Sequence, residues 1–264
     1  MLKIVLIIAF LAPPVFASAE TLEERGEFIS VPSGSFVPLF PDNLNKTKKT
    51  LLPSIKVERF EIQTDPVTNE KFHKFVTKNR QWRKNKSNAL YTNDVYLQHW
   101  KAPLSIPPSL RKSPVTHVSW FAADAYCRSQ KLRLPTTSEW EYVASFPLVV
   151  DNKILSEPAK VRKILEWYGE PSTSKTPSIE NSVKNTLGVR GLFGLVWEWT
   201  YDFNSVLMTT DNRANSDKKN GLFCGGGAFG SNSPEDYARF MRYAHRSSLT
   251  GRYCAANLGF RCAK

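Results

Sequence analysis

The fold of this chain is decided by four short stretches: PVTHVSW at residues 114–120, RLPTTSEWE at 133–141, WEWT at 197–200 and NLGFRC at 257–262. The first two contain helix starts. Ser119 is a typical N-cap, and Thr136 followed by Glu139 has the spacing of a capping box. We therefore expect a short helix after each cap, with its apolar residues turned toward the core. These inward residues would be Ala123, Tyr126, Cys127, Trp140 and Val143.

Upstream of these stretches the pattern predicts strands and then a helix. Residues 28–37 alternate around a Pro-Ser-Gly turn, which predicts a hairpin, and residues 55–62 alternate with period two, which predicts a half-buried strand. Thr68 can cap a helix whose apolar residues fall at i, i+3 and i+4, namely Phe72, Phe75 and Val76.

Long irregular segments separate these elements. Residues 79–113 read as an ordered loop, and residues 147–196 are irregular apart from a short helical pattern at 161–167. The last third predicts short strands at 222–229, 240–247 and 259–262. The pattern as a whole predicts an α+β fold with little regular secondary structure, formed by one domain over residues 20–264.

The first residues predict export. Lys3 provides a positive n-region, residues 4–12 form a short apolar run, and Ala17-Ser18-Ala19 fits a cleavage site before Glu20. We expect residues 1–19 to be a signal peptide and the mature protein to be periplasmic or secreted. No other stretch approaches about 18 apolar residues, so we expect no stable membrane insertion.

The chain is basic, with 36 Lys and Arg against 24 Asp and Glu and a formal net charge of +12. A solvated basic surface explains this charge, and so does attraction to anionic partners such as phospholipid headgroups, cell-wall polymers or an acidic substrate. No nucleic-acid-binding motif accompanies the charge, so we expect no nucleic-acid partner.

Four cysteines in an exported chain indicate disulfides. Cys127, Cys224, Cys254 and Cys262 allow three pairings, and their spacing does not choose among them. They form no C-x-x-C motif and the four histidines are scattered, which argues against a zinc site.

The four quoted stretches, in this order, resemble the formylglycine-generating enzyme family, also called sulfatase-modifying factors. FISVPSGSF at 28–36 is similar to the family's opening F-x-x-I-P-G-G-x-F, and PVTNEKF at 66–72 is similar to its Y-E-V-T-N-x-x-F helix entry. The resemblance covers nearly the whole mature chain. It implies the family's elaboration of the C-type-lectin-like fold and a disulfide between Cys127 and Cys262. In an oxidising compartment, Cys224 and Cys254 would then form a second pair.

The resemblance breaks where the family does its chemistry. Family members bind copper(I) through a cysteine pair after a G-G-S segment and oxidise a substrate cysteine with oxygen, and thiolates suit this soft ion. Here the segment reads GGGAFG at 225–230, with Gly230 at the first cysteine position and the second position near Glu235. Cys224 and Cys254 flank the segment instead of lying in it. The sequence therefore argues against copper as a cofactor.

Other family positions persist around the expected cleft. RYAHRS at 242–247 resembles the family's R-x-A-x-R-S strand, and Asn257 matches the Asn of its S-N-L-G-F-R motif. Arg246 and Asn257 would either donate to a ligand's carbonyls or carboxylates, or satisfy buried backbone groups of the fold. With residues 231–236 at its rim, the cleft would be lined by Trp197, Phe229, Arg242, Arg246 and Asn257.

Calcium is the candidate cofactor that the resemblance leaves. The family's G-L-Y-N-x-x-G-N-x-W-E-W-T reads GVRGLFGLVWEWT at 188–200, so both asparagines are lost, to Gly191 and Leu195. Glu180 and Glu198 are the candidate metal ligands, and water would have to complete the six to eight oxygens that calcium takes. Alternatively, Glu198 is a buried hydrogen-bonding residue between two tryptophans.

Two functions follow, and they differ in whether the chain is an enzyme. The first is an exported formylglycine-generating-enzyme-like protein without copper chemistry, which binds or assists maturation of an envelope protein or a secreted small molecule. Some exported relatives take part in maturation of the siderophore pyoverdine. The second is a periplasmic oxidase that modifies a protein or siderophore substrate with another cofactor.

Overall fold

The computed structural model describes residues 27–36, 54–170, 177–204 and 234–264. Its first four strands form two consecutive two-stranded antiparallel sheets, which together make an interrupted ribbon. β1 (Phe28–Val31) pairs with β4 (Phe60–Gln63), and β2 (Gly34–Phe36) pairs with β3 (Ile55–Val57). The predicted hairpin within residues 28–37 is therefore wrong, because both of its strands pair with 55–63. Pro32 has no N–H to give to a ladder, and it lies where the ribbon is interrupted.

Three helices begin at the predicted caps. α2 (Asn69–Lys78) follows Thr68, α3 (Trp120–Ser129) follows Ser119, and α4 (Thr137–Ser145) follows Thr136. Each cap side chain accepts a hydrogen bond from a backbone N–H of the first turn. All the predicted inward residues of these helices are buried, so the predicted caps and helix faces are confirmed.

The remaining elements are short. The 3-10 turns η1 (Arg80–Trp82), η2 (Pro108–Leu110) and η3 (Ile179–Asn181) lie within the irregular segments. β5 (Leu148–Val150) pairs with both β6 (Lys153–Ile154) and β7 (Lys184–Asn185), and β8 (Trp197–Glu198) pairs in parallel with β9 (Leu258–Gly259). α5 (Glu157–Gly169) is longer than the helical pattern predicted at 161–167.

The C-terminal third differs from its prediction. Residues 240–247 belong to the helix α8 (Pro234–Ser247), not to a strand. Its buried face repeats every four residues, as in a helix, with Ala238, Arg242 and Arg246. Because two of these residues are arginines, a hydrophobicity pattern does not detect this helical period. The predicted strand at 259–262 shortens to β9, and residues 222–229 lie outside the described residues.

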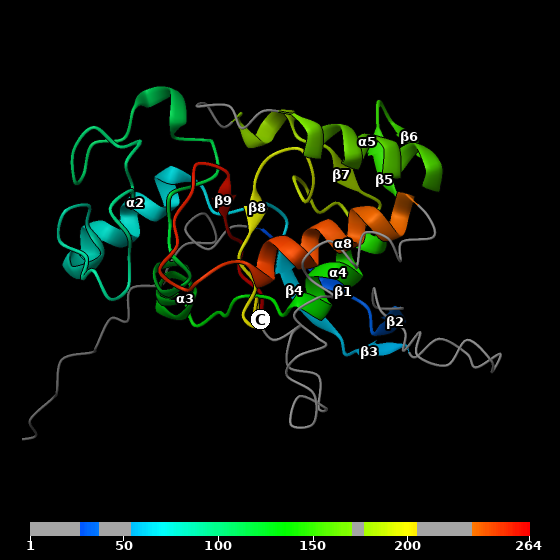
Figure 1. The fold of residues 1–264 in the computed structure, drawn as a ribbon, viewed down its shortest axis with the longest axis horizontal. Helices are drawn as coiled ribbons and strands as arrows, with labels where there is room; N and C mark the ends of the chain where they lie inside the picture. The colour runs from blue at the N-terminus through cyan, green and yellow to red at the C-terminus, as the bar shows by residue number, and fades with distance from the viewer. Residues whose placement is uncertain (1–26, 37–53, 171–176, 205–233) are drawn as a thin grey trace, which may run out of the picture.

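Two hydrophobic clusters fill the interior. The larger joins α2 and α3 to the C-terminal strand region through Phe72, Tyr126 and Phe260, whose rings pack against one another. The second lies under α4 and the ribbon and contains Ile62, Trp140 and other buried residues. Figure 1 shows α2 and α3 at one end of the molecule and α5 with the β5–β7 sheet at the other.

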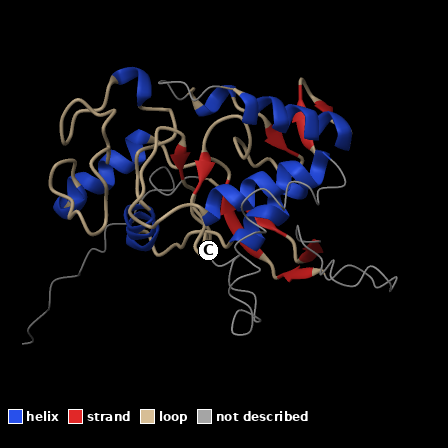
Figure 2. Cartoon of the chain, in the orientation of Figure 1, coloured by secondary structure: helices blue, strands red, loops and turns tan. Residues whose placement is uncertain are grey.

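The fold class is α+β, as predicted, and Figure 2 shows short helices and strands joined by long loops. A disulfide links Cys127 on α3 to Cys262 after β9, which confirms the first predicted pair. Within the described ranges, the structure has no helix of the length and apolar character needed to cross a membrane.

Candidate functional site

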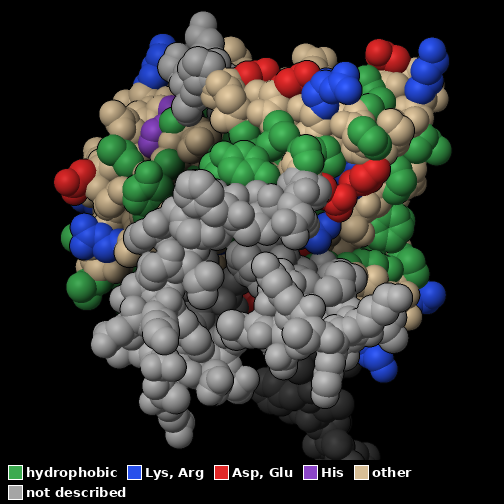
Figure 3. Space-filling model, turned by 45° about the vertical axis from the view of Figure 1, so that its right-hand side comes forward, with side chains coloured by type: hydrophobic (Ala, Val, Ile, Leu, Met, Phe, Trp, Pro, Cys, Tyr) green, Lys and Arg blue, Asp and Glu red, His purple; other side chains and the backbone are tan. Residues whose placement is uncertain are grey.

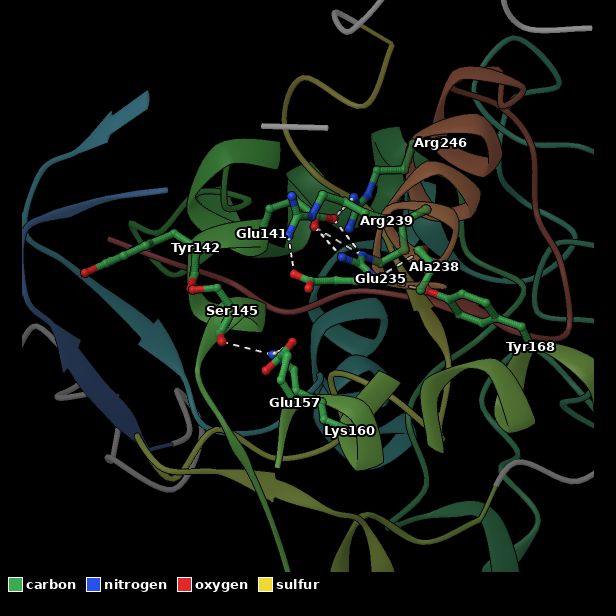
Figure 4. Close-up of polar contacts among 11 residues, drawn as sticks. Glu141, Tyr142, Ser145, Glu157, Lys160, Tyr168, Glu235, Ala238, Arg239 and Arg246 are labelled. Carbon is green, nitrogen blue, oxygen red and sulfur yellow. Dashed lines mark hydrogen bonds and ion pairs between the residues drawn. The ribbon is translucent and has the colours of Figure 1, made fainter. Parts of the chain in front are cut away.

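A cavity of about 360 Å³ lies where α4, α5 and α8 meet β2. Figure 4 shows how the polar side chains around it converge from the three helices. We call it the charged cavity, because most of its polar lining is ionisable: Glu141, Glu157, Lys160, Glu235, Arg239 and Arg242. Its volume is in the lower part of the range of small-molecule sites.

Two residues that line the charged cavity, Glu141 and Arg242, form a buried ion-pair network with Arg246, which lies behind them. Arg242 donates to both oxygens of Glu141 at 2.7–3.1 Å, and Arg246 Nη1 donates to Glu141 Oε1 at 2.7 Å. These three side chains are 2–8 % exposed. Glu141 reaches them because it lies on the inward face of α4, beside Trp140 and one turn before Ala144.

The network holds one negative and two positive charges away from water. Burial disfavours the ionised form of Glu141, but the charges and hydrogen bonds of Arg242 and Arg246 outweigh it and lower its pKa to about 2. The ring of Trp140 lies 4.5 Å from the Arg246 guanidinium carbon and adds a cation–π contact. The carboxylate that holds both arginines in place is therefore ionised at neutral pH.

One donor of this network has no acceptor. The Nε of Arg246 is buried and makes no hydrogen bond in the part of the chain that the structure describes. A buried guanidinium N–H without a partner costs free energy, because it has lost its water and gained nothing. An acceptor oxygen placed at this N–H would remove that cost.

Half-buried aromatic rings adjoin the arginines. Tyr168 accepts a hydrogen bond from Arg242 Nη1 at 3.1 Å, and its ring stacks on Trp197 with a centroid distance of 5.1 Å. The ring centroid of Trp197 also lies 5.1 Å from that of Trp167 and 4.4 Å from that of His245. We call Trp167, Tyr168, Trp197 and His245 the aromatic group. On the face seen in Figure 3, hydrophobic side chains gather near the centre, with charged side chains along part of their edge.

The structure brings four of the five predicted ligand-binding residues into one region. Arg242 and Arg246 share Glu141, Trp197 packs on His245 next to Arg246 in α8, and the Trp197 N–H donates to the Asn257 carbonyl at 2.7 Å. The fifth residue, Phe229, lies outside the described residues, as does the 231–233 part of the predicted rim.

Among the described residues, the Arg246 side chain donates a hydrogen bond to the carboxylate of Glu141, which the sequence analysis missed, and not to a backbone group. Arg242 donates to Glu141 and also to the backbone carbonyl of Ala238 at 3.2 Å. Lys160, Tyr168 and His245 were missed as well. The signal for Glu141 was present, since it shares the inward helix face of Thr137, Trp140 and Ala144. A carboxylate on such a face needs a buried cationic partner.

The residues predicted to bind calcium fit that ion poorly. Glu198 is fully buried and uses both oxygens, which accept from Arg261 at 2.7–3.1 Å and from Trp140 Nε1 at 2.7 Å. Glu180 is exposed and pairs with Lys112 at 2.7 Å. No group of three or more metal-binding side chains occurs among the described residues. Calcium binding stays a prediction, and Glu198 behaves as the alternative interpretation expected.

The described residues contain only one cysteine of the second predicted disulfide, Cys254. Cys254 is a free thiol, 2 % exposed, and packs in the larger core cluster, while Cys224 lies outside the described residues. A cysteine in such a position behaves as a small apolar side chain. Burial raises the pKa of this thiol to about 11, so the reactive thiolate is scarce at neutral pH.

Residues 14–264 match the family model described as the sulfatase-modifying factor enzyme 1-like domain. The chain belongs to this family. The match confirms the resemblance on which the expected fold rested. The residues of the charged cavity, the aromatic group and the disulfide all lie within the matched region of this chain.

Curated relatives include the formylglycine-generating enzymes of Mus musculus and Streptomyces coelicolor. The mouse protein is 31 % identical over 185 residues, covering 62 % of this chain and 48 % of the mouse protein. The Streptomyces protein is 30 % identical over 184 residues, covering 62 % and 58 %. The chain therefore spans about half the length of these relatives. A mouse protein named inactive C-alpha-formylglycine-generating enzyme 2 is 26 % identical over 244 residues, covering 79 % and 76 %.

Similar solved structures include PvdO from Pseudomonas aeruginosa, with 18 % identity and a TM-score of 0.47, covering 91 % of this chain and 95 % of that one. The Treponema denticola variable protein 1 has 17 % identity and a TM-score of 0.46, covering 89 % and 94 %.

Proposed function

We propose that this chain is an exported binding member of the sulfatase-modifying factor family, which assists maturation of an envelope or secreted partner without copper chemistry. It recognises a carboxylate or carbonyl of that partner through Arg246. The observation that carries the proposal is the buried Arg246 Nε, which has no acceptor among the described residues. A partner oxygen placed there would receive a charge-assisted hydrogen bond from a donor that is already desolvated.

Two features of the site support recognition. Glu141 fixes both arginines before a partner arrives, so little side-chain entropy is lost on binding. The aromatic group offers half-buried rings beside the arginines, and such rings contribute apolar contact at low entropic cost. The net charge of +12 favours acidic partners.

The absence of copper chemistry is tested on purified protein incubated with copper(I) under reducing conditions. We expect no stoichiometric copper by metal analysis after desalting and no oxygen uptake with cysteine-containing peptides. Stoichiometric copper together with peptide oxidation would overturn the proposal and establish an oxidase.

The binding role is tested separately with N-acetylglycine, which carries an amide carbonyl and a carboxylate. Trp140 beneath Arg246 and Trp197 beside it should report binding through tryptophan fluorescence. We expect a saturable change that is lost in Arg246→Lys, which keeps a positive charge near Glu141 but removes the Nε donor. Arg162→Lys, at an exposed position of α5, is the matched control. A wild-type protein without a saturable response, or an unchanged response in Arg246→Lys, would contradict the role of Arg246.

A further inference from the structure

Lys160 is a buried lysine in the wall of the charged cavity. It lies on α5 and its side chain is only 5 % exposed, whereas lysine side chains normally keep their ammonium group in water. Figure 4 shows it extending toward α4, where Nζ lies 2.9 Å from the carbonyl oxygen of Ser145. The carboxylate of Glu157, one turn earlier in α5, lies 3.4 Å from Nζ.

The surroundings of Lys160 make its amine easier to deprotonate than that of an exposed lysine. Burial lowers the pKa of Lys160, with Glu157 opposing the shift and the nearby Arg242 adding to it. Ser145 ends α4, so its carbonyl would accept an N–H from either form of the amine. Glu157 is about half exposed and can pass a proton between Nζ and solvent. A buried lysine of this kind is a typical nucleophile toward carbonyl compounds.

We infer that Lys160 is a covalent attachment site at which a small aldehyde entering the charged cavity is captured as an imine. The Nζ lone pair attacks the carbonyl carbon and forms the C–N bond. The two Nζ protons are transferred to the carbonyl oxygen, with Glu157 as the carboxylate within reach that can relay them, and this oxygen leaves as water. One amine and one aldehyde give one imine and one water, so the step needs no oxidant or reductant. This site is independent of the recognition of carboxylates by Arg246.

The experiment is reductive alkylation of the folded chain at neutral pH with glycolaldehyde and cyanoborohydride, followed by peptide mass spectrometry. The added hydride reduces the imine to a stable secondary amine. Lys163 is the matched control, since it lies on the same helix and is exposed. We expect Lys160 to be alkylated faster than Lys163, because a lowered pKa leaves a larger fraction of its amine unprotonated at neutral pH, by at most about tenfold per pKa unit.

Two outcomes decide the inference. Preferential labelling of Lys160 that disappears on unfolding in urea supports it, because the reactivity then belongs to the folded cavity. Labelling of Lys163 and other exposed lysines with Lys160 unmodified overturns it, and leaves Lys160 as a structural cap of α4. Lys160→Arg keeps hydrogen-bond donors beside Ser145 and Glu157 but cannot form the adduct, so its Lys163 labelling rate should equal that of the wild type.

Discussion

At the scale of single residues, the carboxylate of Glu141 holds two buried arginines in place. A mutation that removes its charge should therefore lower the stability of the fold. Glu141→Gln keeps the shape but removes the charge that compensates Arg242 and Arg246. Breaking a buried pair in this way costs about 3–5 kcal/mol of unfolding free energy, since it leaves an uncompensated charge. Urea unfolding should show this loss, and Glu166→Gln, at an exposed position of α5, should change stability little. Equal stability of the two variants would contradict the network.

His99 makes a second prediction at this scale, concerning pH. Burial, with smaller contributions from His117 and Lys84, lowers the pKa of His99 to about 3. Its ring stacks on the ring of His117, with 5.1 Å between the centroids. Its Nε2 forms a hydrogen bond of 2.8 Å with Asn69 Oδ1. The unfolded chain therefore binds more protons than the folded chain between about pH 6.5 and 3, and His99 costs stability progressively as the pH falls through that window.

Removing the ionisable ring should flatten this dependence. We expect His99→Phe to lose less stability than the wild type between pH 6.5 and 3.5, as measured by urea unfolding at a series of pH values. Any residual slope in the variant would come from other groups, such as Glu141, whose low pKa makes its contribution disappear only as the pH falls below about 4.5. Identical slopes in both proteins would show that His99 does not carry the effect.

At the scale of elements, the close approach of β2 to α4 depends on one glycine. A Cβ at Gly34 would lie 2.1 Å from the hydroxyl oxygen of Tyr142, so Gly34→Ala forces the tyrosine or the strand to move. Because β2 also supplies Ser35 and Phe36 to the charged cavity, the cavity would change with it. We expect a loss of about 1–3 kcal/mol, typical of overpacking.

The control for this variant is Gly169→Ala, at the end of α5, where a Cβ would meet no atom within 4 Å. That variant should leave the thermal midpoint unchanged or slightly raised, since it restricts the unfolded chain. Gly34→Ala should lower the midpoint and alter the tryptophan fluorescence of the cavity region. Two variants with the same midpoint would mean that β2 and α4 are not in close contact.

How far sequence predicted these elements depends on what each one needs. The helices after Thr68, Ser119 and Thr136 are set by local caps and apolar spacing, which a sequence displays directly. The pairing of β1 with β4 is set by contacts about 30 residues apart across the chain, which no local pattern contains. α8 was mistaken for a strand because its inward face carries arginines, whose burial only Glu141 on another helix explains.

At the scale of the whole molecule, the sequence pointed to residues that the fold places near one another, but not to the contacts that they make. Family motifs located Trp197, Arg242, Arg246 and Asn257, and the fold brings them together. Their partners come from α4 and α5, which lie 74–105 residues from the arginines they contact. Motifs can therefore indicate residues that lie near one another. The Arg246–Glu141 pair and the burial of Lys160 could be recognised only once the packing of α4, α5 and α8 was known.

The disulfide between Cys127 and Cys262 acts at this largest scale, because it joins residues 135 apart and the loop it closes contains α4, α5 and α8. On the chain-entropy model, closing so long a loop in the unfolded state stabilises the fold by about 5 kcal/mol. Cys127→Ala/Cys262→Ala should therefore lower the unfolding free energy by several times more than Cys254→Ala, which removes only a small buried thiol. Urea unfolding of the three proteins measures this difference.

Alkylation of the urea-unfolded, unreduced wild type supplies an independent check: Cys254 should be modified, and Cys127 and Cys262 should not. A peptide map in which Cys254 is instead linked to Cys224 would contradict the free thiol and restore the second disulfide predicted from the sequence.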